Sequence, residues 1–253
     1  MSDDIIVAMQ DVKKSYGADS TAAKEGSVEC MVLQDINLTV HRGDYISIMG
    51  RSGSGKSTLL NLIGLLLPAT DGSITWDGRE VSSLWDSELA DIRRRDIGFV
   101  FQDFQLIRSL SLLDNIMLPA LLNKSSEEDA ERRANELAST LELNDALLQK
   151  RPGNVSGGER QRAAIARALM NDPKLILADE PTGNLDEKSA GIVAGMLRRV
   201  HEKMNKAIVL VTHNPSLAAD SQKMYYLRDG RLGVPVLNQG NRDEYYRKIL
   251  AEM

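Results

Sequence analysis

The segment "GRSGSGKST" at residues 50–58 contains the residue types that bind a chain of phosphates. Its glycines let backbone N–H groups approach phosphate oxygens closely, and the N-terminus of a following helix adds a favourable partial charge. In this pattern Lys56 reaches the β- and γ-phosphates, and the hydroxyl of Ser57 reaches Mg²⁺. The apolar run "YISIM" precedes the segment and the helical pattern "TLLNLIGLLL" follows it, which is the context that the pattern requires. The segment therefore predicts a nucleotide-phosphate site.

The segment "LILADEP" at residues 175–181 places two adjacent acids at the end of an apolar run. An unpaired carboxylate at the end of a buried strand is costly, so the pair indicates a function. Asp179 is suited to hold Mg²⁺, directly or through water, and Glu180 to orient and deprotonate an attacking water. The alternative is a surface acid pair that caps the next segment.

A second glycine-rich stretch, "VSGGERQRAAIAR", occupies residues 155–167. Ser156 and Glu159 have the spacing of a capping box at the start of a helix. The box does not account for Gly157 and Gly158, since a glycine in a helix costs about 1 kcal/mol relative to alanine. A helix N-terminus with bare backbone also binds anions. Because the chain has one lysine-bearing phosphate loop, we predict that these glycines contact a nucleotide bound by a second copy.

Four short apolar runs predict the buried parallel strands that position these groups, because their apolar residues do not alternate with polar ones. They occupy residues 45–49, 97–101, 175–178 and 207–212, and helical patterns separate them. In open parallel sheets, ligands bind beyond the carboxyl ends of the strands. The four runs end at groups capable of chemistry, namely Gly50, Gln102, Asp179 with Glu180, and His213.

The remaining segments predict an antiparallel part and a helical part. Residues 1–44 and "GSITWDG" at 72–78 are typical of antiparallel strands, with a polar loop at 17–30. Ser125, three residues before Glu128, predicts a capping box, and an apolar stripe follows it at Ala130, Ala134, Leu137 and Leu141. We expect one domain, 1–253, with a core at 1–102 and 165–237, a helical insert at 103–164 and a C-terminal surface helix within 238–253.

Composition excludes several classes of protein. The net charge of −5 argues against a dedicated nucleic-acid binder, which usually has a basic surface. The one cysteine, Cys30, forms no internal disulfide, and this favours a reducing compartment. The start "MSDDIIVAMQ" lacks the pattern of a signal peptide, and the most apolar stretch, 59–67, is about half the length that crosses a bilayer. A role at a membrane would therefore depend on a partner protein.

The block "VSGGERQRAAIARALMNDPKLILADEPTGNLD" resembles the signature, Walker B and D-loop motifs of the ATP-binding-cassette (ABC) ATPases. The spacing from the phosphate loop through Gln102 to His213 is similar to that family over about residues 5–232. The resemblance implies a P-loop NTPase (RecA-like) α/β fold with a mostly parallel sheet, an N-terminal antiparallel β subdomain and an inserted α-helical subdomain. It also implies that two copies face each other head to tail and hydrolyse ATP with Mg²⁺. Each ATP would lie between the phosphate loop of one copy and the signature of the other.

The resemblance also assigns roles to single residues. Tyr16, in "KSYG", would stack on adenine, with a plain strand-end tyrosine as the alternative. Gln102 would approach Mg²⁺ and signal to the membrane partner, and His213 would touch the γ-phosphate. Asp186 would cross the dimer interface, and Glu180 would be the catalytic base. Phosphate and metal contacts would come from Gly50, Ser52, Gly53, Ser54, Gly55, Lys56, Ser57, Thr58 and Asp179, and contacts to the other copy's ATP from Ser156, Gly157, Gly158 and Glu159.

Val155 and Glu159 depart from the commonest family signature, which has leucine and glutamine at these positions. Glutamate still closes the capping box, so the helix geometry is expected to be unchanged. Because Glu159 is charged and glutamine is not, we assign Glu159 no contact with the ribose of the nucleotide bound by the other copy.

The segment "FVFQDFQLIRSLSLLDNIMLPAL" is similar to the ABC branch of macrolide exporters, lipoprotein-releasing complexes, antimicrobial-peptide transporters and a cell-division relative. This implies an integral membrane partner subunit, a homodimer in the ATP-bound state and a peripheral position on the cytoplasmic face of the inner membrane, with no nucleic acid bound. Residues 103–124 are expected to dock the membrane partner, with simple helix packing as the alternative.

Two other functions are weighed against the transporter. The first is a non-transport ABC ATPase acting in cell division or on nucleic acid. Chromosome-type members carry a very long coiled coil where this chain has about 100 residues, and excision-repair members carry cysteine clusters. The second is a P-loop kinase for a small molecule, which assigns no role to Gly157 and Gly158.

Overall fold

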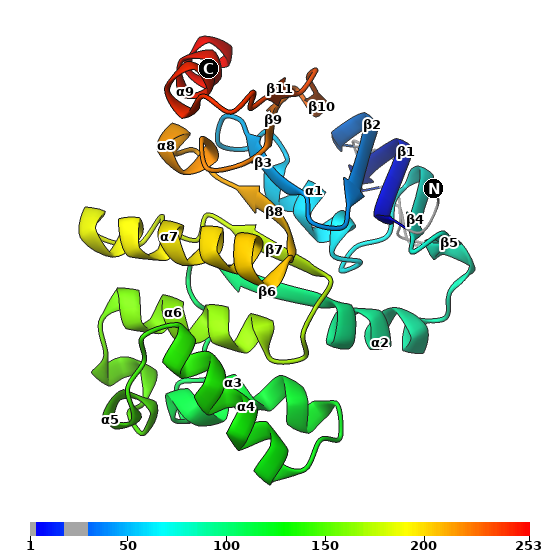
Figure 1. Ribbon diagram of the computed structural model, residues 1–253. Coiled ribbons are helices and arrows are strands. Elements are labelled where there is room, and N and C mark those ends of the chain that lie inside the picture. Colours follow the sequence, from blue (N-terminus) through cyan, green and yellow to red (C-terminus); the bar gives the residue numbers. More distant parts are fainter. Residues whose placement is uncertain (1–3, 18–29) are drawn as a thin grey trace. The chain divides into compact units, whose positions relative to one another are not determined.

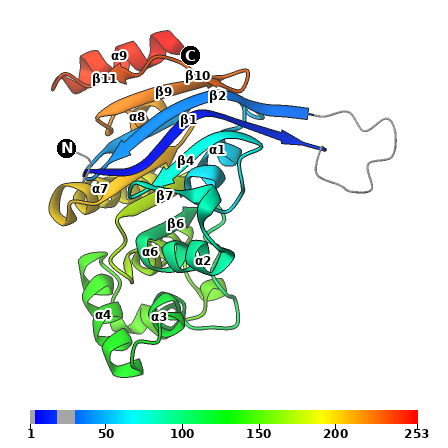
Figure 2. The same ribbon diagram turned by 90° about the vertical axis from the view of Figure 1, so that its right-hand side faces the viewer.

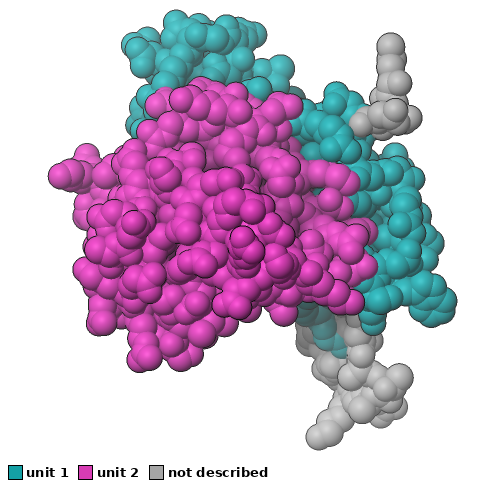
Figure 3. Space-filling model, turned by 60° about the horizontal axis from the view of Figure 1, so that its bottom comes forward, with its two compact units in different colours: residues 1–89, 209–253 teal, residues 90–208 magenta. Residues whose placement is uncertain are grey.

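The computed structural model describes residues 4–17 and 30–253, which divide into two compact units (Figure 3). Unit 1 comprises residues 1–89 and 209–253, and unit 2 comprises residues 90–208. The predicted loop at 17–30 lies, except for its two ends, outside the described residues. The predicted boundaries of core, helical insert and C-terminal helix stay a prediction.

An antiparallel sheet forms the first part of unit 1. Its strands are β1 (Ile5–Tyr16), β2 (Cys30–His41), β4 (Asp71–Trp76) and β5 (Arg79–Glu80), in the spatial order β2-β1-β4-β5 (Figure 1). β1 and β2 run side by side as long strands (Figure 2), and a short 3₁₀ helix, η1 (Val81–Ser83), follows β5. The antiparallel strands predicted for this part of the sequence are confirmed.

Unit 1 also contains a parallel strand pair. β3 (Tyr45–Met49) runs parallel to β9 (Lys223–Arg228), and the short strands β10 (Arg231–Leu232) and β11 (Val236–Leu237) pair antiparallel with β9. All five residues of β3 are buried, as predicted, including the one polar residue, Ser47, whose hydroxyl lies 2.9 Å from the hydroxyl of Ser221. After β3 the chain passes through the phosphate loop into α1 (Lys56–Ile63).

A small apolar cluster attaches the C-terminal helix to the rest of unit 1. The helix α9 (Arg242–Glu252) packs Tyr245 and Ile249 against Met49, Met224 and the helix α8 (Pro215–Ala218). The Tyr245 hydroxyl lies 3.1 Å from the hydroxyl of Ser221, and burial raises the pKa of Tyr245. The cluster explains why the last turns of the chain are ordered as a helix.

Unit 2 combines a parallel strand pair with helices. β6 (Ile97–Phe101) runs parallel to β7 (Leu175–Asp179). The helices are α3 (Leu112–Leu122), α4 (Glu127–Thr140), α5 (Asp145–Leu148), the 3₁₀ helix η2 (Pro152–Asn154), α6 (Gly157–Leu169) and α7 (Glu187–Met204). α2 (Asp86–Asp96) and β8 (Ala207–Val211) carry the chain from one unit into the other. The four apolar runs predicted as strands are thus confirmed to within one residue at each end.

None of the helices in the described part of the chain has both the length and the apolar character needed to cross a membrane.

The helix α4 begins one residue later than the sequence predicts. Its apolar stripe is buried as expected, but its N-cap is Ser126, whose Oγ accepts a hydrogen bond from the Asp129 N–H at 3.1 Å. Ser125 instead donates its N–H to the Ala120 carbonyl at 3.0 Å and closes the turn after α3. The predicted capping box of Ser125 and Glu128 is therefore wrong. Both Ser125 and Ser126 precede an acid by three residues, so the sequence pattern fits either serine. The turn after α3 uses the backbone of Ser125, and this leaves Ser126 as the N-cap.

Ile249→Ala is expected to lower the free energy of unfolding by about 2–4 kcal/mol, because it leaves a cavity beside Tyr245 in the cluster that holds α9. The measurement is unfolding in urea followed by circular dichroism. Leu250→Ala, at the next position and 45% exposed, is the matched control and should change this free energy by less than about 0.5 kcal/mol. Equal losses in both variants would contradict the packing role of Ile249.

Candidate functional site

The predicted site residues divide between the two units. Tyr16, the phosphate loop at 50–58 and His213 lie in unit 1. Unit 2 contains the others, namely Gln102, Asp179, Glu180, Ser156, Gly157, Gly158, Glu159 and Asp186.

Close packing forces glycine at two positions of the phosphate loop. A Cβ atom at Gly50 would lie 2.4 Å from the Leu227 carbonyl oxygen and 2.8 Å from Ser54 Oγ, closer than real Cβ atoms approach. Gly55 has a φ of +100°, and a Cβ there would lie 2.9 Å from Leu33 Cδ2. Without side chains at Gly50 and Gly55, the loop packs closely against Leu227 of β9 and Leu33 of β2.

The N-terminus of α1 is prepared for an anion. Within the described residues, no side chain caps it, and no acid occupies its first turn. Its leading N–H groups therefore have neither intrahelical acceptors nor a capping carboxylate. The hydroxyl of Ser54 is buried in the loop with no hydrogen-bond partner among the described atoms, and Lys56 Nζ spans the loop, donating to the carbonyls of Gly50 and Arg51 at 2.9 Å each. Donors and positive charge thus converge where a phosphate chain would bind.

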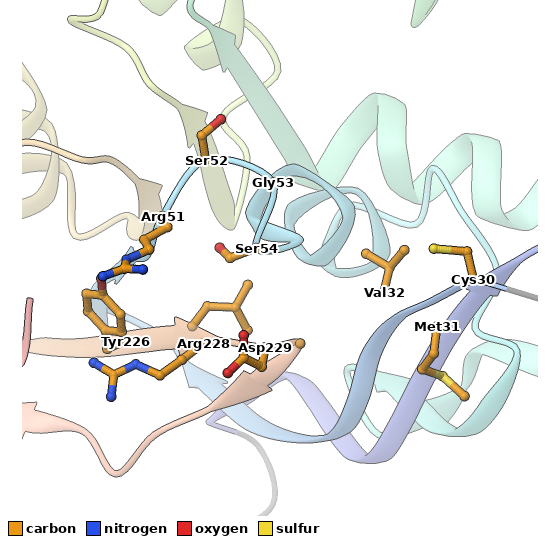
Figure 4. Close-up of a pocket in the computed structure, with 12 residues that line it drawn as sticks. Cys30, Met31, Val32, Arg51, Ser52, Gly53, Ser54, Tyr226, Arg228 and Asp229 are labelled. Carbon is orange, nitrogen blue, oxygen red and sulfur yellow. The ribbon is translucent and has the colours of Figure 1, made fainter.

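A hollow of about 750 Å³ adjoins the phosphate loop (Figure 4). Residues 51–54 of the loop, 30–32 at the start of β2 and 226–230 around the β9–β10 turn line it. Tyr16 ends β1 opposite Cys30, one of the lining residues. Its ring is 43% exposed, and Lys14 Nζ lies 5.2 Å from the ring centroid. An exposed aromatic ring in this place can stack on a nucleotide base, and the alternative of a plain strand-end tyrosine stays open.

His213 lies at the same end of unit 1 as the phosphate loop. The Thr212 N–H donates to the Ile48 carbonyl at 3.1 Å. The chain therefore leaves β8 beside the carboxyl end of β3, where Gly50 begins the loop. The His213 side chain is exposed there.

In unit 2 the carboxyl ends of two strands place Gln102 beside the acid pair. Phe101 of β6 is paired in register with Asp179 of β7, so Gln102 and Glu180 follow as neighbours. Glu180 has a φ of +47°, a left-handed conformation that is uncommon for a residue with a side chain. Such backbone strain is concentrated at functional sites.

The turn after Glu180 holds Gln102 in place. Gln102 Nε2 donates to Asn184 Oδ1 at 3.3 Å, and Asn184 Nδ2 donates to the Gln102 carbonyl at 3.1 Å. A Cβ at Gly183 would lie 2.7 Å from Gln102 Nε2, so the turn approaches the amide closely. Asn184 was not predicted as a site residue, because its partner is 82 positions away in the sequence.

A reciprocal capping box begins α6. The N–H and the hydroxyl of Ser156 both donate to Glu159 Oε2, at 2.7 and 2.8 Å, and the Glu159 N–H donates to Ser156 Oγ at 3.3 Å. The Ser156 N–H, followed by the Ser156 hydroxyl, holds the pKa of Glu159 below its usual range. The predicted capping box of Ser156 and Glu159 is confirmed, and the carboxylate is ionised at neutral pH.

The two glycines of α6 pack against the start of α7. A Cβ at Gly158 would lie 3.1 Å from Ser189 Oγ and 3.2 Å from Ser189 Cβ. A Cβ at Gly157 would meet Leu185 Cδ2, the flexible end of a side chain, at 3.1 Å. Tight packing against Ser189 is thus a structural reason for a small residue at Gly158, beside the predicted contact with a second copy's nucleotide, which stays a prediction.

Asp186 is the N-cap of α7. Its carboxylate accepts hydrogen bonds from the Ser189 N–H at 3.0 Å and the Ser189 hydroxyl at 2.7 Å, and these bonds lower the pKa of Asp186. The residue thus has a capping role in addition to the predicted interface role. Residues 180–189 contact Gln102 through Asn184 and the start of α6 through Leu185 and Ser189.

Two arginines of α6 hold the loop that follows Gln102. Arg167 donates to the carbonyls of Phe104 and Gln105, and Arg160 lies 4.9 Å from the Phe104 ring centroid. Burial lowers the pKa of Arg167. Phe104 and Gln105 both have positive φ, so the arginine stabilises an unusual loop conformation. The sequence did not predict this role of Arg167, because an arginine within an alanine-rich helix gives no sign of its hydrogen-bond partner.

The comparisons with known proteins agree with this geometry. The sequence matches the family described as ABC transporter over residues 33–183. The lipoprotein-releasing system ATP-binding protein LolD of Alcanivorax borkumensis is 44% identical over 211 residues, which cover 83% of this chain and 92% of LolD. The macrolide export ATP-binding/permease protein MacB of Aggregatibacter actinomycetemcomitans is 44% identical over 208 residues, which cover 82% of this chain and 32% of MacB.

Solved structures show the same fold. The dimeric post-hydrolysis structure of the ATP-binding cassette MJ0796 of Methanocaldococcus jannaschii, bound to ADP and Pi, has a TM-score of 0.83 and 39% identity, covering 93% of this chain and 100% of that one. This similarity confirms the predicted α/β fold of a P-loop NTPase.

Gly158→Ala is expected to lower the free energy of unfolding, because the new methyl group would press on Ser189, whose side chain is held by Asp186. Gly195→Ala, within α7 with no described atom in 4 Å of the new methyl group, is the control and should raise this free energy by about 0.5–1 kcal/mol through helix propensity. Unfolding in urea measures both changes. If Gly158→Ala stabilised the protein as much as the control, the packing role of Gly158 would be refuted.

Proposed function

We propose that this chain, which belongs to the ABC transporter family as an ATP-hydrolysing subunit, closes head to tail on a second copy around two ATP molecules and drives a membrane protein. The observation that carries the proposal is that the sequence has one lysine-bearing phosphate loop, before α1, and a second glycine-rich helix N-terminus, at Ser156, Gly157 and Gly158 before and within α6. The similarity to a dimeric cassette supports the pairing of two copies. Closure completes each reaction centre with residues from both copies.

The residues of unit 1 bind the nucleotide. The N–H groups of the phosphate loop and of the start of α1 hold the phosphates, and Lys56 adds positive charge at the β- and γ-phosphates. The unpartnered Ser54 hydroxyl and the bare helix end fit this role. Tyr16 stacks on adenine beside the hollow, and His213, at the same end of the sheet, contacts the γ-phosphate.

The residues of unit 2 supply the chemistry of hydrolysis. Glu180 orients the attacking water and accepts its proton, and its strained backbone supports a functional assignment. Ser57, Gln102 and Asp179 would hold Mg²⁺, since their hydroxyl, amide and carboxylate oxygens are the donors that this ion prefers. When bound, the ion neutralises charge on the phosphates.

The partner copy contributes the N-terminus of α6. Ser156, Gly157 and Gly158 contact the γ-phosphate bound by the other copy, and Asp186 lies at the interface between the copies. ATP therefore favours the closed pair, and loss of the γ-phosphate contacts on hydrolysis allows it to open.

The work is delivered to an integral membrane protein at the cytoplasmic face of the membrane. The similarity to LolD and MacB supports a function in lipoprotein release, macrolide export or a related mechanical task. Residues 103–124, which follow Gln102 and are anchored by Arg167, are the proposed docking segment. The alternative is a non-transport ABC ATPase that acts in cell division or on nucleic acid. Purification from detergent-solubilised membranes tests the proposal, because the identity of a membrane protein that copurifies distinguishes a transporter from a regulator.

Glu180→Gln is expected to lower kcat for ATP hydrolysis by about 10²–10⁴-fold, because the base is lost while the phosphate contacts remain. ATP should then accumulate in a closed dimer. Size-exclusion chromatography with light scattering, with ATP or ADP in the buffer, measures the dimer.

Lys56→Ala in the same background is the control, and it should remain monomeric because its phosphate contacts are weakened. A Glu180→Gln variant that stayed monomeric at saturating ATP would contradict the head-to-tail proposal.

Ser156→Arg is expected to leave ATP binding by a single copy intact and to lower kcat by about 10²-fold or more, because a donor to the other copy's γ-phosphate is lost. Fluorescence titration with a nucleotide analogue and steady-state hydrolysis separate the two effects. Ser126→Arg removes the cap of α4 away from the site and is the matched control for helix stability. A kinase would retain its activity with Ser156→Arg, so an unchanged kcat would favour that function.

A further inference from the structure

Both donors of Ser156 are already engaged in the structure of a single copy. The N–H and the hydroxyl both point to Glu159 Oε2, at 2.7 and 2.8 Å. Ser156 is exposed and Glu159 is partly exposed, so both are accessible to a second copy. The anion-binding end of α6 thus carries an anion of its own.

This arrangement conflicts with binding of a second anion at the same hydroxyl. A serine hydroxyl has one proton to donate, and an ionised carboxylate can only accept. In the single copy the Ser156 proton is therefore directed to Glu159, and a phosphate that binds this hydroxyl must compete with the carboxylate for it. A phosphate oxygen at hydrogen-bond distance from the same hydroxyl would also lie about 4–5 Å from the carboxylate oxygen. At that separation two negative charges repel each other even in water.

We propose that Glu159 is a positioning residue that opposes closure of the ATP-bound pair, because its carboxylate holds the Ser156 donors and repels the partner's triphosphate. The inference rests on the head-to-tail function proposed above. Glutamine at this position would keep an acceptor for the Ser156 N–H and remove the charge. Glu159 therefore raises the ATP concentration at which two copies close.

The rival role of Glu159 is capping alone, and the chain contains a matched case. Asp129 occupies the same position of α4, and it accepts a hydrogen bond from Ser126 Oγ at 2.7 Å. The Ser126 hydroxyl lowers the pKa of Asp129, so this cap is also ionised. Asp129 is outside the binding residues and the docking segment. Asp129 also pairs with Arg132 at 2.6 Å, so its replacement reports the loss of a capping charge and of one exposed ion pair, both away from the site.

The test is an ATP titration of dimer formation by the Glu180→Gln protein, with and without Glu159→Gln, followed by analytical ultracentrifugation. The additional Glu159→Gln change should lower the ATP concentration at half-dimerisation by about fivefold, which corresponds to about 1 kcal/mol between two charges 4 Å apart in water. Asp129→Asn in the same background should leave this midpoint unchanged. The gain from Glu159→Gln should shrink between 50 mM and 500 mM NaCl, roughly as the screening length falls.

A second readout tests whether Glu159 acts through Ser156. On a Ser156→Ala background the gain from Glu159→Gln should be smaller, because the two residues would then be uncoupled. In the protein with Glu180 intact, Glu159→Gln should lower KM for ATP with little change in kcat.

The outcomes separate this inference from the proposed function. Failure of the Glu180→Gln protein itself to dimerise refutes the head-to-tail function. Dimerisation with a midpoint that Glu159→Gln leaves unchanged or raises, at both salt concentrations, refutes the role of Glu159 and leaves it a helix cap. Equal midpoint shifts in Glu159→Gln and Asp129→Asn would also refute it, since the effect would then come from helix capping in general.

Discussion

The unpaired N–H groups at the start of α1 are the constraint on which the rest of the structure depends. The residues that carry these N–H groups, Lys56, Ser57 and Thr58, are exposed or partly exposed. The phosphate loop adds the hydroxyl of Ser54, which is buried with no partner among the described atoms, and such a group costs about 1–3 kcal/mol. The close packing at Gly50 and Gly55 fixes the loop beside these donors, so a phosphate chain bound there would find them already in place.

The two helix ends proposed to contact phosphate differ in how their N–H groups are satisfied before any ligand binds. The start of α1 has no capping side chain in the described residues, whereas α6 is capped reciprocally by Ser156 and Glu159. A phosphate at the start of α1 would therefore meet N–H groups that no side chain caps. A phosphate at the start of α6 would compete with the carboxylate of Glu159. This difference supports an order of events in which one copy binds ATP firmly and closure follows as the weaker, adjustable step. A switch needs such a step, because a ligand can shift an equilibrium only through its different affinity for the two states.

The segment 180–189 connects the parts of unit 2 that are proposed to act on the nucleotide. It begins at the strained residue Glu180, holds Gln102 through Asn184 and packs on α6 through Ser189. Arg167 of α6 in turn fixes the loop after Gln102. Because these contacts are close and share one segment, a displacement of residues 180–189 would move α6 and the loop after Gln102 together. The proposed coupling to a membrane protein thus has a structural basis within a single unit.

The sequence by itself determined the features that depend on neighbouring residues. The strands at 45–49 and 97–101, the phosphate loop and the capping box of Ser156 were predictable because apolar runs, glycine spacing and a serine three residues before an acid act locally. The cap of α4 was not, since Ser125 and Ser126 have the same local pattern and the turn after α3 chose between them.

Only the tertiary structure decided which distant groups meet. Gln102 pairs with Asn184, Arg167 binds the carbonyls after Gln102, and Gly158 is small because Ser189 lies against it. Local pattern carries no information about such partners, because they become neighbours only when β6, β7, α6 and α7 pack together. The roles of the single residues in catalysis follow the same rule, because the chemistry depends on distances that the fold sets.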